Sequence, residues 1–145
     1  MSPDENKAIF LRFLAELRKG NLGIIDEVCS PKFTFYSPTY PDWPRGLDGA
    51  RQLIRYGRSV FTEAQTTVED IFADRDRVVV RWATRGTYRG EARPGFPNPG
   101  QHFAMGAISI YRFVDGKIED DWGAEAFSMN GEPWGMSGGD GDPTS

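Results

Sequence analysis

The first part of the chain carries hydrophobic residues at the spacing of an amphipathic helix. Between residues 3 and 19 they recur every three or four positions, as Ile9, Phe10, Phe13, Leu14 and Leu17. Ser2 is a suitable N-cap, Pro3 suits the first helical position, and Gly20 ends the segment. The pattern predicts a helix over residues 3–19 with one apolar face turned toward a core.

Two further helices are expected before the main run of strands. A short helix over residues 22–28 is followed by a short strand at residues 33–36. The loop at residues 37–46 is rich in proline, which keeps it out of regular structure. Asp48 can cap a third helix that extends to about Val60.

The second half of the chain has the pattern of strands. Residues rich in β-branched and aromatic side chains occupy four segments, at residues 66–73, 77–91, 102–113 and 118–127. Asp115-Gly116 is typical of a tight turn, so the last two segments are expected to form a hairpin. The Pro- and Gly-rich residues 93–100 cannot form a central strand.

Helices followed by hairpin-connected strands are the pattern of an α+β fold. The helices are expected to pack on one face of a curved, mostly antiparallel sheet. A chain of 145 residues suits one hydrophobic core, and we expect a single domain over residues 1–130. Residues 131–145 are rich in Gly, Ser, Asp and Pro, which predicts a flexible tail.

The charge balance argues against a nucleic-acid partner. The chain has 17 Lys and Arg against 21 Asp and Glu, and its arginines alternate with acidic and apolar residues. No apolar run approaches the length of a membrane span, and the N-terminus lacks the apolar core of a signal peptide. One Cys and one His are too few for an internal disulfide or a zinc site. These features predict a cytoplasmic protein without a membrane partner or a metal.

Two motifs resemble a known family. The pattern RVVVRW…GTYRG lies at residues 77–90, and YRFVDGKI…DW lies at residues 111–122. Together they resemble the SnoaL-like polyketide cyclases, or ester cyclases, of the nuclear-transport-factor-two-like superfamily. The resemblance covers roughly residues 5–128. It implies three N-terminal helices on a strongly curved sheet, which forms a conical barrel around a deep pocket.

The resemblance also carries functional expectations. Family members act without a metal or an organic cofactor, and they usually form a homodimer through the outer face of the sheet. SnoaL-like cyclases close a ring in an aromatic polyketide by an aldol reaction, with an Asp as acid and base. The resemblance therefore implies a small apolar or aromatic metabolite as the partner.

The chain departs from the family pattern at positions that matter for chemistry. Members often carry an Asp four residues after the strand Trp, where this chain has Ala126, so the nearest carboxylate is Glu125. Tyr88 stands where many members have His, and Phe61-Thr62-Glu63 replaces a common Phe-Pro-Asp. The acid and base must therefore be sought among this chain's own residues.

Strand alternation divides the acidic residues of the last strand between two faces. One face carries Ile118, Asp120, Trp122, Ala124 and Ala126, and the other carries Glu119, Asp121, Gly123, Glu125 and Phe127. The resemblance aligns Trp122 with the pocket face, so Glu125 points inward only if Gly123 forms a bulge. On this interpretation Glu119 and Asp121 face outward, as does Tyr111.

The predicted catalytic residues are His102, Glu125, Asp120 and Tyr88. His102 is the only histidine, its ordinary pKa is near neutrality, and its strand pairs with the acidic one. Burial would raise the pKa of a carboxyl group, which suits a general acid or base. Tyr88 could donate a hydrogen bond to a developing oxyanion or an epoxide oxygen. The predicted pocket wall consists of Tyr36, Tyr40, Trp43, Phe61, Trp82, Met105 and Trp122.

Three functions remain open at this level. The first is a cofactor-independent cyclase that closes a ring in a polyketide-type metabolite by acid–base chemistry. The second is an epoxide-opening cyclase or hydrolase, or an isomerase, of the same fold. The third is a dimeric module that binds a small molecule without catalysis.

Overall fold

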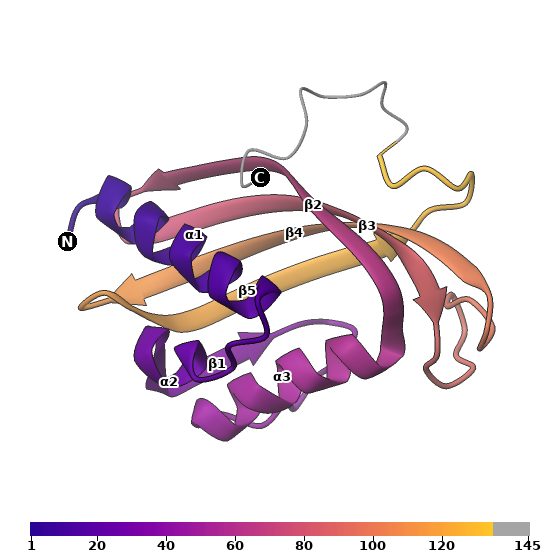
Figure 1. Cartoon of the computed structure of the whole chain (residues 1–145), viewed down its shortest axis with the longest axis horizontal. Helices are drawn as coiled ribbons and strands as arrows, with labels where there is room; N and C mark the ends of the chain where they lie inside the picture. Colours follow the sequence, from indigo (N-terminus) through magenta and orange to yellow (C-terminus); the bar gives the residue numbers. More distant parts are fainter. Residues whose placement is uncertain (135–145) are drawn as a thin grey trace.

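The helices and strands follow one another in the predicted order. In the computed structural model, which describes residues 1–134, the elements are α1 (Pro3–Arg18), α2 (Ile24–Val28), β1 (Cys29–Tyr36), α3 (Gly46–Val60), β2 (Phe61–Asp74), β3 (Arg77–Tyr88), β4 (His102–Val114) and β5 (Lys117–Phe127) (Figure 1). The Ser2 hydroxyl accepts a hydrogen bond from the backbone N–H of Glu5 at 3.1 Å, so the predicted N-cap is confirmed. None of the helices in residues 1–134 is long and apolar enough to cross a membrane.

Two strands begin earlier than the sequence pattern predicts. β1 starts at Cys29 rather than at residue 33, and β2 starts at Phe61 rather than at residue 66. The early part of β2 pairs with the end of β3, where Phe61 lies opposite Tyr88. Backbone pairing across the sheet therefore extends β2 through Glu63 and Ala64, whose residue types have little strand propensity of their own.

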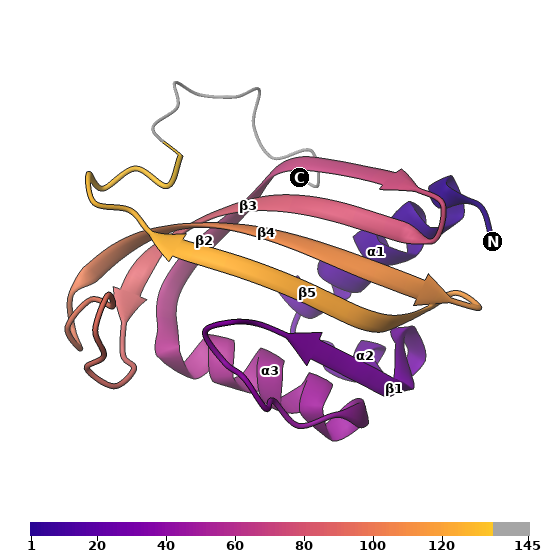
Figure 2. The same cartoon turned by 180° about the vertical axis from the view of Figure 1, so that it is seen from behind.

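The five strands form one mixed sheet in the order β1-β5-β4-β3-β2. β1 runs parallel to β5, and the other neighbouring strands are antiparallel. Two opposite views show α1 across one face of the sheet (Figures 1 and 2). The sheet is open, with β1 and β2 as edges, rather than closed into the expected conical barrel. Helix α3 contacts both edge strands and so spans the open side.

The main core lies between α1 and the inner face of the sheet, which is the face that α1 covers. Phe10 is the centre of this contact, with its ring 4.6 Å from the Tyr111 ring and 6.1 Å from the Trp82 ring, between centroids. The buried aliphatic residues Ile24, Ile25, Val68, Val78, Val80 and Ile118 complete it. Burial of these side chains is the main force that holds α1 and α2 on the sheet.

A β-bulge at Glu119 decides which residues of β5 face the core. Arg112 of β4 lies opposite Asp120, whereas its neighbour Phe113 lies opposite Ile118, so Glu119 is an extra residue in β5. An extra residue reverses the alternation of side chains after it. Ile118 and Asp121 therefore point to the same face of the sheet, contrary to the simple alternation expected from the sequence.

The segment after β5 folds back over the outer face of the sheet. The Nε1–H of Trp134 donates to the backbone oxygen of Trp82 at 2.7 Å, and Glu132 forms an ion pair with Arg85. Residues 131–134 of the expected tail thus lie against β3, and the rest of that tail lies outside the described residues. Elsewhere on the sheet Phe72 is 56% exposed and Ile108 is 44% exposed. A homodimer through the outer face stays a prediction.

Candidate functional site

A cavity of about 310 Å³ lies between the helices and the inner face of the sheet. Apolar side chains form most of its wall, among them Phe10, Phe13, Leu17, Leu53, Ile54 and Met105. The polar groups come mainly from the sheet, where Asp121, Ser109 and Tyr111 line the cavity beside Trp82 and Cys29. An apolar cavity with a few convergent polar groups is the usual form of a small-molecule site.

Asp121 is the buried acid of this cavity. Its residue is 7% exposed, and burial raises the pKa of its carboxyl group from an ordinary 3.8 to about 7. One carboxyl oxygen, Oδ1, is buried without a hydrogen-bond partner among the described residues. A buried carboxyl oxygen without a partner is costly, and such groups are concentrated at functional sites. A pKa near 7 allows this group both to take up and to release a proton at neutral pH.

Hydroxyl groups from β4 lie beside Asp121. Tyr111 is directly opposite Asp121 in the β4–β5 ladder. Burial, and next the neighbouring Asp121 carboxylate, raise the pKa of the Tyr111 phenol well above its ordinary value, so the phenol stays protonated. The Trp82 indole N–H donates to Ser109 Oγ at 3.1 Å. The site therefore pairs one titrating carboxyl group with a neutral hydrogen-bond donor.

Cys29 lines the same cavity but is unsuited to act as a nucleophile. Burial is the largest cause that raises the pKa of its thiol to about 12, and the nearby carboxylate of Asp121 adds to the effect. The reactive form of cysteine is the thiolate, which is scarce at neutral pH when the pKa is this high. Cys29 therefore acts as a small apolar residue.

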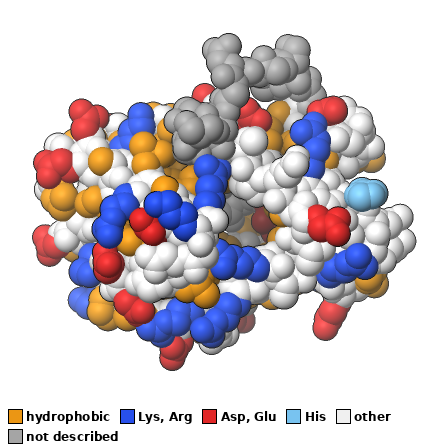
Figure 3. Space-filling view, in the orientation of Figure 1, with side chains coloured by type: hydrophobic (Ala, Val, Ile, Leu, Met, Phe, Trp, Pro, Cys, Tyr) orange, Lys and Arg blue, Asp and Glu red, His pale blue; other side chains and the backbone are white. Residues whose placement is uncertain are grey.

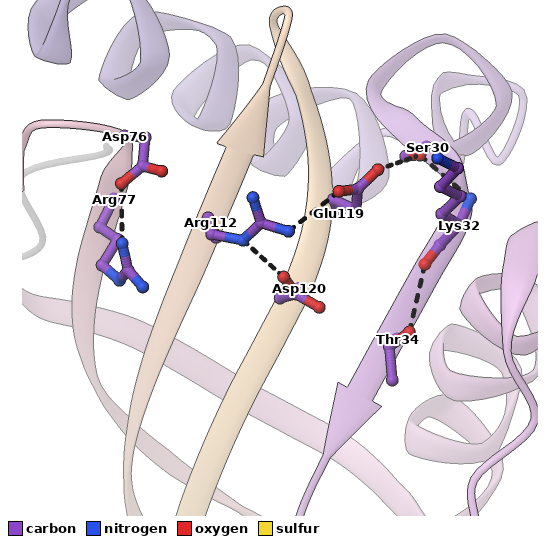
Figure 4. A network of polar contacts seen from close by, with 8 residues as sticks. All are labelled: Ser30, Lys32, Thr34, Asp76, Arg77, Arg112, Glu119 and Asp120. Carbon is purple, nitrogen blue, oxygen red and sulfur yellow. Dashed lines mark hydrogen bonds and ion pairs between the residues drawn. The ribbon is translucent and has the colours of Figure 1, made fainter.

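The inward position of Asp121 corrects the sequence interpretation, which placed it outside. The physical reason is the bulge, which is held by hydrogen bonds from Arg112. The Arg112 guanidinium donates to Asp120 Oδ2 at 2.6 Å and to Glu119 Oε2 at 2.9 Å (Figure 4). Both carboxylates lie on the outer face beside one arginine, and the next residue, Asp121, turns inward.

Asp120 is therefore a structural acid and does not line the cavity. Its carboxylate is engaged by Arg112, and the adjoining Glu119 also accepts a hydrogen bond from the Ser30 hydroxyl at 3.1 Å (Figure 4). An Arg flanked by two acids explains why an acidic strand is tolerated here. The prediction that Asp120 faces the pocket is wrong, because it assumed an unbroken alternation.

Glu125 points to the inner face, as one of the sequence hypotheses required. It lies opposite Ala107, which lines the cavity, and its Oε1 atom is buried without a hydrogen-bond partner among residues 1–134. The bulge at Glu119 produces this orientation, whereas the hypothesis placed a bulge at Gly123. Gly123 serves another purpose, since a Cβ there would come within 3.3 Å of the Phe35 ring.

Tyr40 and Arg93 lie near Glu125, and Tyr40 belongs to a cluster of aromatic rings. The rings of Tyr40, Trp43 and Tyr56 contact one another edge to face, with centroids 5.3 to 5.9 Å apart. The Arg93 guanidinium lies 5.3 Å above the Tyr40 ring and donates to the Thr39 backbone oxygen at 3.1 Å. Burial raises the pKa of the Glu125 carboxyl group, and the positive charge of Arg93 opposes that rise.

Replacing Arg93 with Met is expected to raise the pKa of Glu125 further. The substitution removes the charge that favours the Glu125 carboxylate and leaves the burial that disfavours it. The pKa can be followed by the carboxyl carbon resonance of Glu125 during an NMR titration. Arg93→Lys, which keeps the positive charge, should titrate closer to the parent protein. An unchanged Glu125 titration in Arg93→Met would contradict this electrostatic link.

Tyr88 and His102 do not join Asp121. The Tyr88 hydroxyl donates to the backbone oxygen of Glu91 at 2.7 Å, and its ring packs in a second core cluster. His102 is exposed at the beginning of β4, and it lies nine residues before Tyr111 along this strand. Nine residues of strand span about 30 Å. The hairpin therefore keeps the only histidine far from the buried carboxyl group, and the four predicted catalytic residues do not converge.

The predicted pocket wall is divided between the two faces of the sheet. Trp82 and Met105 line the cavity, and Phe61 lines a surface cleft that adjoins it. Tyr36 and Trp122 instead stack on the outer face, with ring centroids 5.4 Å apart. Their position follows from the same bulge, since Trp122 comes one residue after Asp121 in the alternation.

The sequence interpretation missed Asp121 and Tyr111, and it gave no role to Ser109. One signal could have revealed Asp121. A single arginine on the partner strand, Arg112, faces two successive acids, and this arrangement indicates a bulge that turns both acids to one face. For Tyr111 no local signal exists, because β4 carries apolar residues on both faces.

The described residues contain no group of three or more His, Cys, Asp or Glu side chains arranged to hold a metal ion. The polar groups that line the cavity are one carboxyl group, hydroxyl groups, a thiol and an indole. Their chemistry is that of proton transfer and hydrogen bonding.

Comparison with known proteins identifies the family. A sequence model of the SnoaL-like polyketide cyclases matches residues 8–126. No curated protein gives a significant match. Among solved structures, AclR, a proposed hydroxylase from Streptomyces galilaeus, is 28% identical to this chain, with a TM-score of 0.65. The match covers 90% of this chain and 83% of that chain. A proposed polyketide cyclase from Acidithiobacillus ferrooxidans is 27% identical, with a TM-score of 0.66 and coverage of 83% and 87%.

A third structure supports the fold alone. It is a SnoaL-like protein from Jannaschia sp. CCS1, 20% identical, with a TM-score of 0.72 and coverage of 86% of this chain and 89% of that chain. The family match spans both motifs singled out in the sequence and all the strands that build the cavity. The chain belongs to the SnoaL-like polyketide cyclase family.

Proposed function

We propose that this protein is a cyclase that closes a ring in a small polyketide-type substrate by an intramolecular aldol reaction. The observation that carries the proposal is Asp121, a buried carboxyl group in an apolar cavity with a pKa of about 7. Family membership supports the reaction class. Of the four catalytic residues predicted from the sequence, Glu125 lies on the inner face of the same strand as Asp121, and of the predicted wall residues Trp82 and Met105 line the cavity.

The proposed reaction moves one proton out of the substrate and returns it. The Asp121 carboxylate takes a proton from a carbon next to a substrate carbonyl, which leaves an enolate. The neutral Tyr111 phenol donates a hydrogen bond to the enolate oxygen, where negative charge develops. The enolate carbon then forms a bond to a second carbonyl carbon of the same molecule. The alkoxide that results takes the proton back from Asp121, so the carboxylate is restored.

The apolar wall contributes in two ways. It excludes water, which keeps the pKa of Asp121 near neutrality and protects the enolate from protonation by solvent. It also holds the substrate in a folded shape in which its two reacting carbons are close, and this lowers the entropic cost of ring closure. The volume of about 310 Å³ is near the lower end of known ligand pockets, about 300 to 1,000 Å³. A small substrate fits these dimensions.

Epoxide opening by the same carboxyl group is a second candidate. Near neutral pH a carboxyl group with a pKa of about 7 is protonated in a large fraction of molecules, so it can donate a proton to an epoxide oxygen. The two reactions use opposite protonation states of Asp121. Their rates should therefore depend on pH in opposite directions.

The proposal is tested with the purified protein and a panel of small linear compounds that carry two carbonyl groups in a 1,5 or 1,6 relation. Ring closure is followed by liquid chromatography with mass detection, and exchange of the acidic C–H groups is followed by NMR in D₂O. We expect both processes to exceed the buffer rate and to rise with pH through about 7, as the Asp121 carboxylate forms. A set of small epoxides tests the second candidate. Ligand binding without ring closure, C–H exchange or epoxide opening would favour the non-catalytic binding module instead.

A further inference from the structure

We propose that the surface cleft between the end of α1, α3 and β2 is the entrance to the cavity, and that its basic rim binds a carboxylate or phosphate group of the substrate. The proposal names a substrate class for the cavity and rests on the proposed function in treating the cavity as the substrate site. The ligand it predicts is an amphiphilic anion with an apolar body.

The cleft and the cavity share wall residues. The cleft has a volume of about 1030 Å³, and Leu17, Thr66 and Met105 are among the residues that line both spaces. These shared residues come from α1, β2 and β4, so they surround the passage from several sides. Asp121, Ser109 and Tyr111 line only the cavity. A ligand that enters through the cleft therefore meets apolar wall first and the titrating carboxyl group last.

The rim of the cleft is basic. Arg18 and Lys19 come from the end of α1, and Arg58 comes from the last turn of α3. Neither Asp nor Glu is among the described residues that line the cleft. The space-filling view shows basic side chains around a hollow near the middle of the molecule (Figure 3). This concentration of positive charge is notable in a chain with a net charge of −4.

Arg58 is the best-placed anion ligand of the rim. One of its amino groups donates to the backbone oxygen of Leu17 at 2.6 Å, across the cleft. That contact orients the guanidinium, which has five N–H donors in total. Arg18 is oriented in a similar way, by a hydrogen bond to the Thr66 backbone oxygen at 3.2 Å. Guanidinium groups held in place bind carboxylate and phosphate oxygens with less loss of side-chain entropy.

Helix stabilisation explains only part of this charge. Basic residues near the C-terminus of a helix interact favourably with its dipole, and this applies to Arg18 and Lys19 at the end of α1 and to Arg58 in the last turn of α3. Lys19 also has a local partner, since its ammonium group is 3.7 Å from the Glu16 carboxylate. The dipoles do not explain why the ends of two helices bring these cations to the same cleft. A rim that draws cations from two helices, above an apolar cavity, matches an anion with an apolar body.

The carboxyl groups on the inner face of the sheet would orient such a ligand. Asp121 and Glu125 both face inward, and an anionic group placed beside them would be repelled. The anion is therefore favoured at the rim, and the uncharged, reactive part of the molecule is directed toward Asp121. This arrangement separates the binding group from the reacting carbon atoms.

The test compares two non-reacting probes of nearly the same shape, 1-naphthylacetate and neutral 1-naphthylacetamide. Their dissociation constants are measured by calorimetry and by quenching of Trp fluorescence, since Trp82 lines the cavity. A charge-assisted hydrogen bond contributes about 1.5 to 3 kcal/mol, so we expect the acid to bind about tenfold or more tightly than the amide. Added salt should reduce this preference. The related ester 1-naphthyl phosphate shows whether carboxylate or phosphate is preferred.

Two variants of α3 form a matched pair. Arg58→Gln should lose most of the preference for the acid while its affinity for the amide stays unchanged, which also shows that the cavity is intact. Arg55→Gln changes an exposed residue of the same helix that does not line the cleft, and it should keep the parent preference. Lys19→Gln, at an exposed side chain, gives a second measurement of the rim if Arg58→Gln folds poorly.

Equal affinity for the two probes, or a preference for the acid that survives in both Arg58→Gln and Lys19→Gln, would overturn the proposal. Failure of both probes to bind would overturn it too. These measurements do not depend on turnover. If the acid binds preferentially and no ring closure is found, the entrance stands and the proposed function fails. If ring closure is found without a preference for the acid, the proposed function stands and the proposed basic entrance fails.

Discussion

Replacing Asp121 with Asn is expected to lower the rate of ring closure about 10²- to 10⁴-fold, the usual contribution of a general acid or base. Asn has nearly the same shape as Asp but cannot take a proton from carbon. The cavity, the Tyr111 phenol and the apolar wall would remain, so a substrate should still bind. The measurement is the initial rate of cyclisation at saturating substrate, together with the substrate dissociation constant.

Asp120→Asn is the matched control for this experiment. It makes the same chemical change at the neighbouring residue, whose carboxylate is held by Arg112 on the outer face. The Asn side-chain oxygen can still accept the Arg112 hydrogen bond that holds the bulge, so we expect a modest change in stability and a turnover rate within a few-fold of the parent rate. If Asp121→Asn kept full activity, or if Asp120→Asn were the variant that lost it, the assignment of the acid–base group would be wrong.

The same Asp121→Asn variant should gain stability relative to the parent protein as the pH rises. In the unfolded chain the Asp121 pKa is about 4, and in the folded protein it is about 7. Below pH 4 both states are protonated, and this group has no effect on the equilibrium. Between pH 4 and pH 7 the unfolded state loses its proton first, which favours unfolding by about 1.4 kcal/mol per pH unit. The parent protein therefore loses about 4 kcal/mol from this group by pH 8.

Urea unfolding at pH 4 and pH 8 measures this effect. The free energy of unfolding of the variant minus that of the parent should increase by about 4 kcal/mol between the two pH values. Taking the difference removes the contributions of the other titrating groups, which the two proteins share. A difference that does not change with pH would show that Asp121 is ionised at its ordinary pKa in the folded protein. Higher stability with lost activity would indicate that this buried acid is retained for chemistry.

Some features of the fold were predictable because they depend on neighbouring residues. The Ser2 cap, the apolar stripe of α1 and the Asp115-Gly116 turn are local patterns, and each is present in the structure. The limits of β1 and β2 were less predictable, because pairing with distant strands extends them. The open edges of the sheet also depend on long-range contacts, since α3 spans the side on which a barrel would have closed.

The chemistry of the candidate site was predictable from the sequence, but the identity of its residues was less so. Burial of a carboxyl group among aromatic residues, with a raised pKa, was expected for Asp120 or Glu125. Glu125 does face inward, and its pKa is raised as expected. The deeper acid is Asp121, which simple strand alternation assigns to the outer face. The ordinary pKa of histidine suits proton transfer, but the place of His102 at the beginning of β4 sets it far from the cavity.

The sequence by itself determined the order of the helices and strands, the family, and the presence of several acids on the last strand. Only the tertiary structure decided which acid enters the cavity. The reason is the single extra residue at Glu119, which Arg112 of the neighbouring strand holds together with Asp120. One inserted residue reverses the faces of every later side chain in a strand. A contact between two strands therefore turns Asp121, rather than Asp120, toward the substrate cavity.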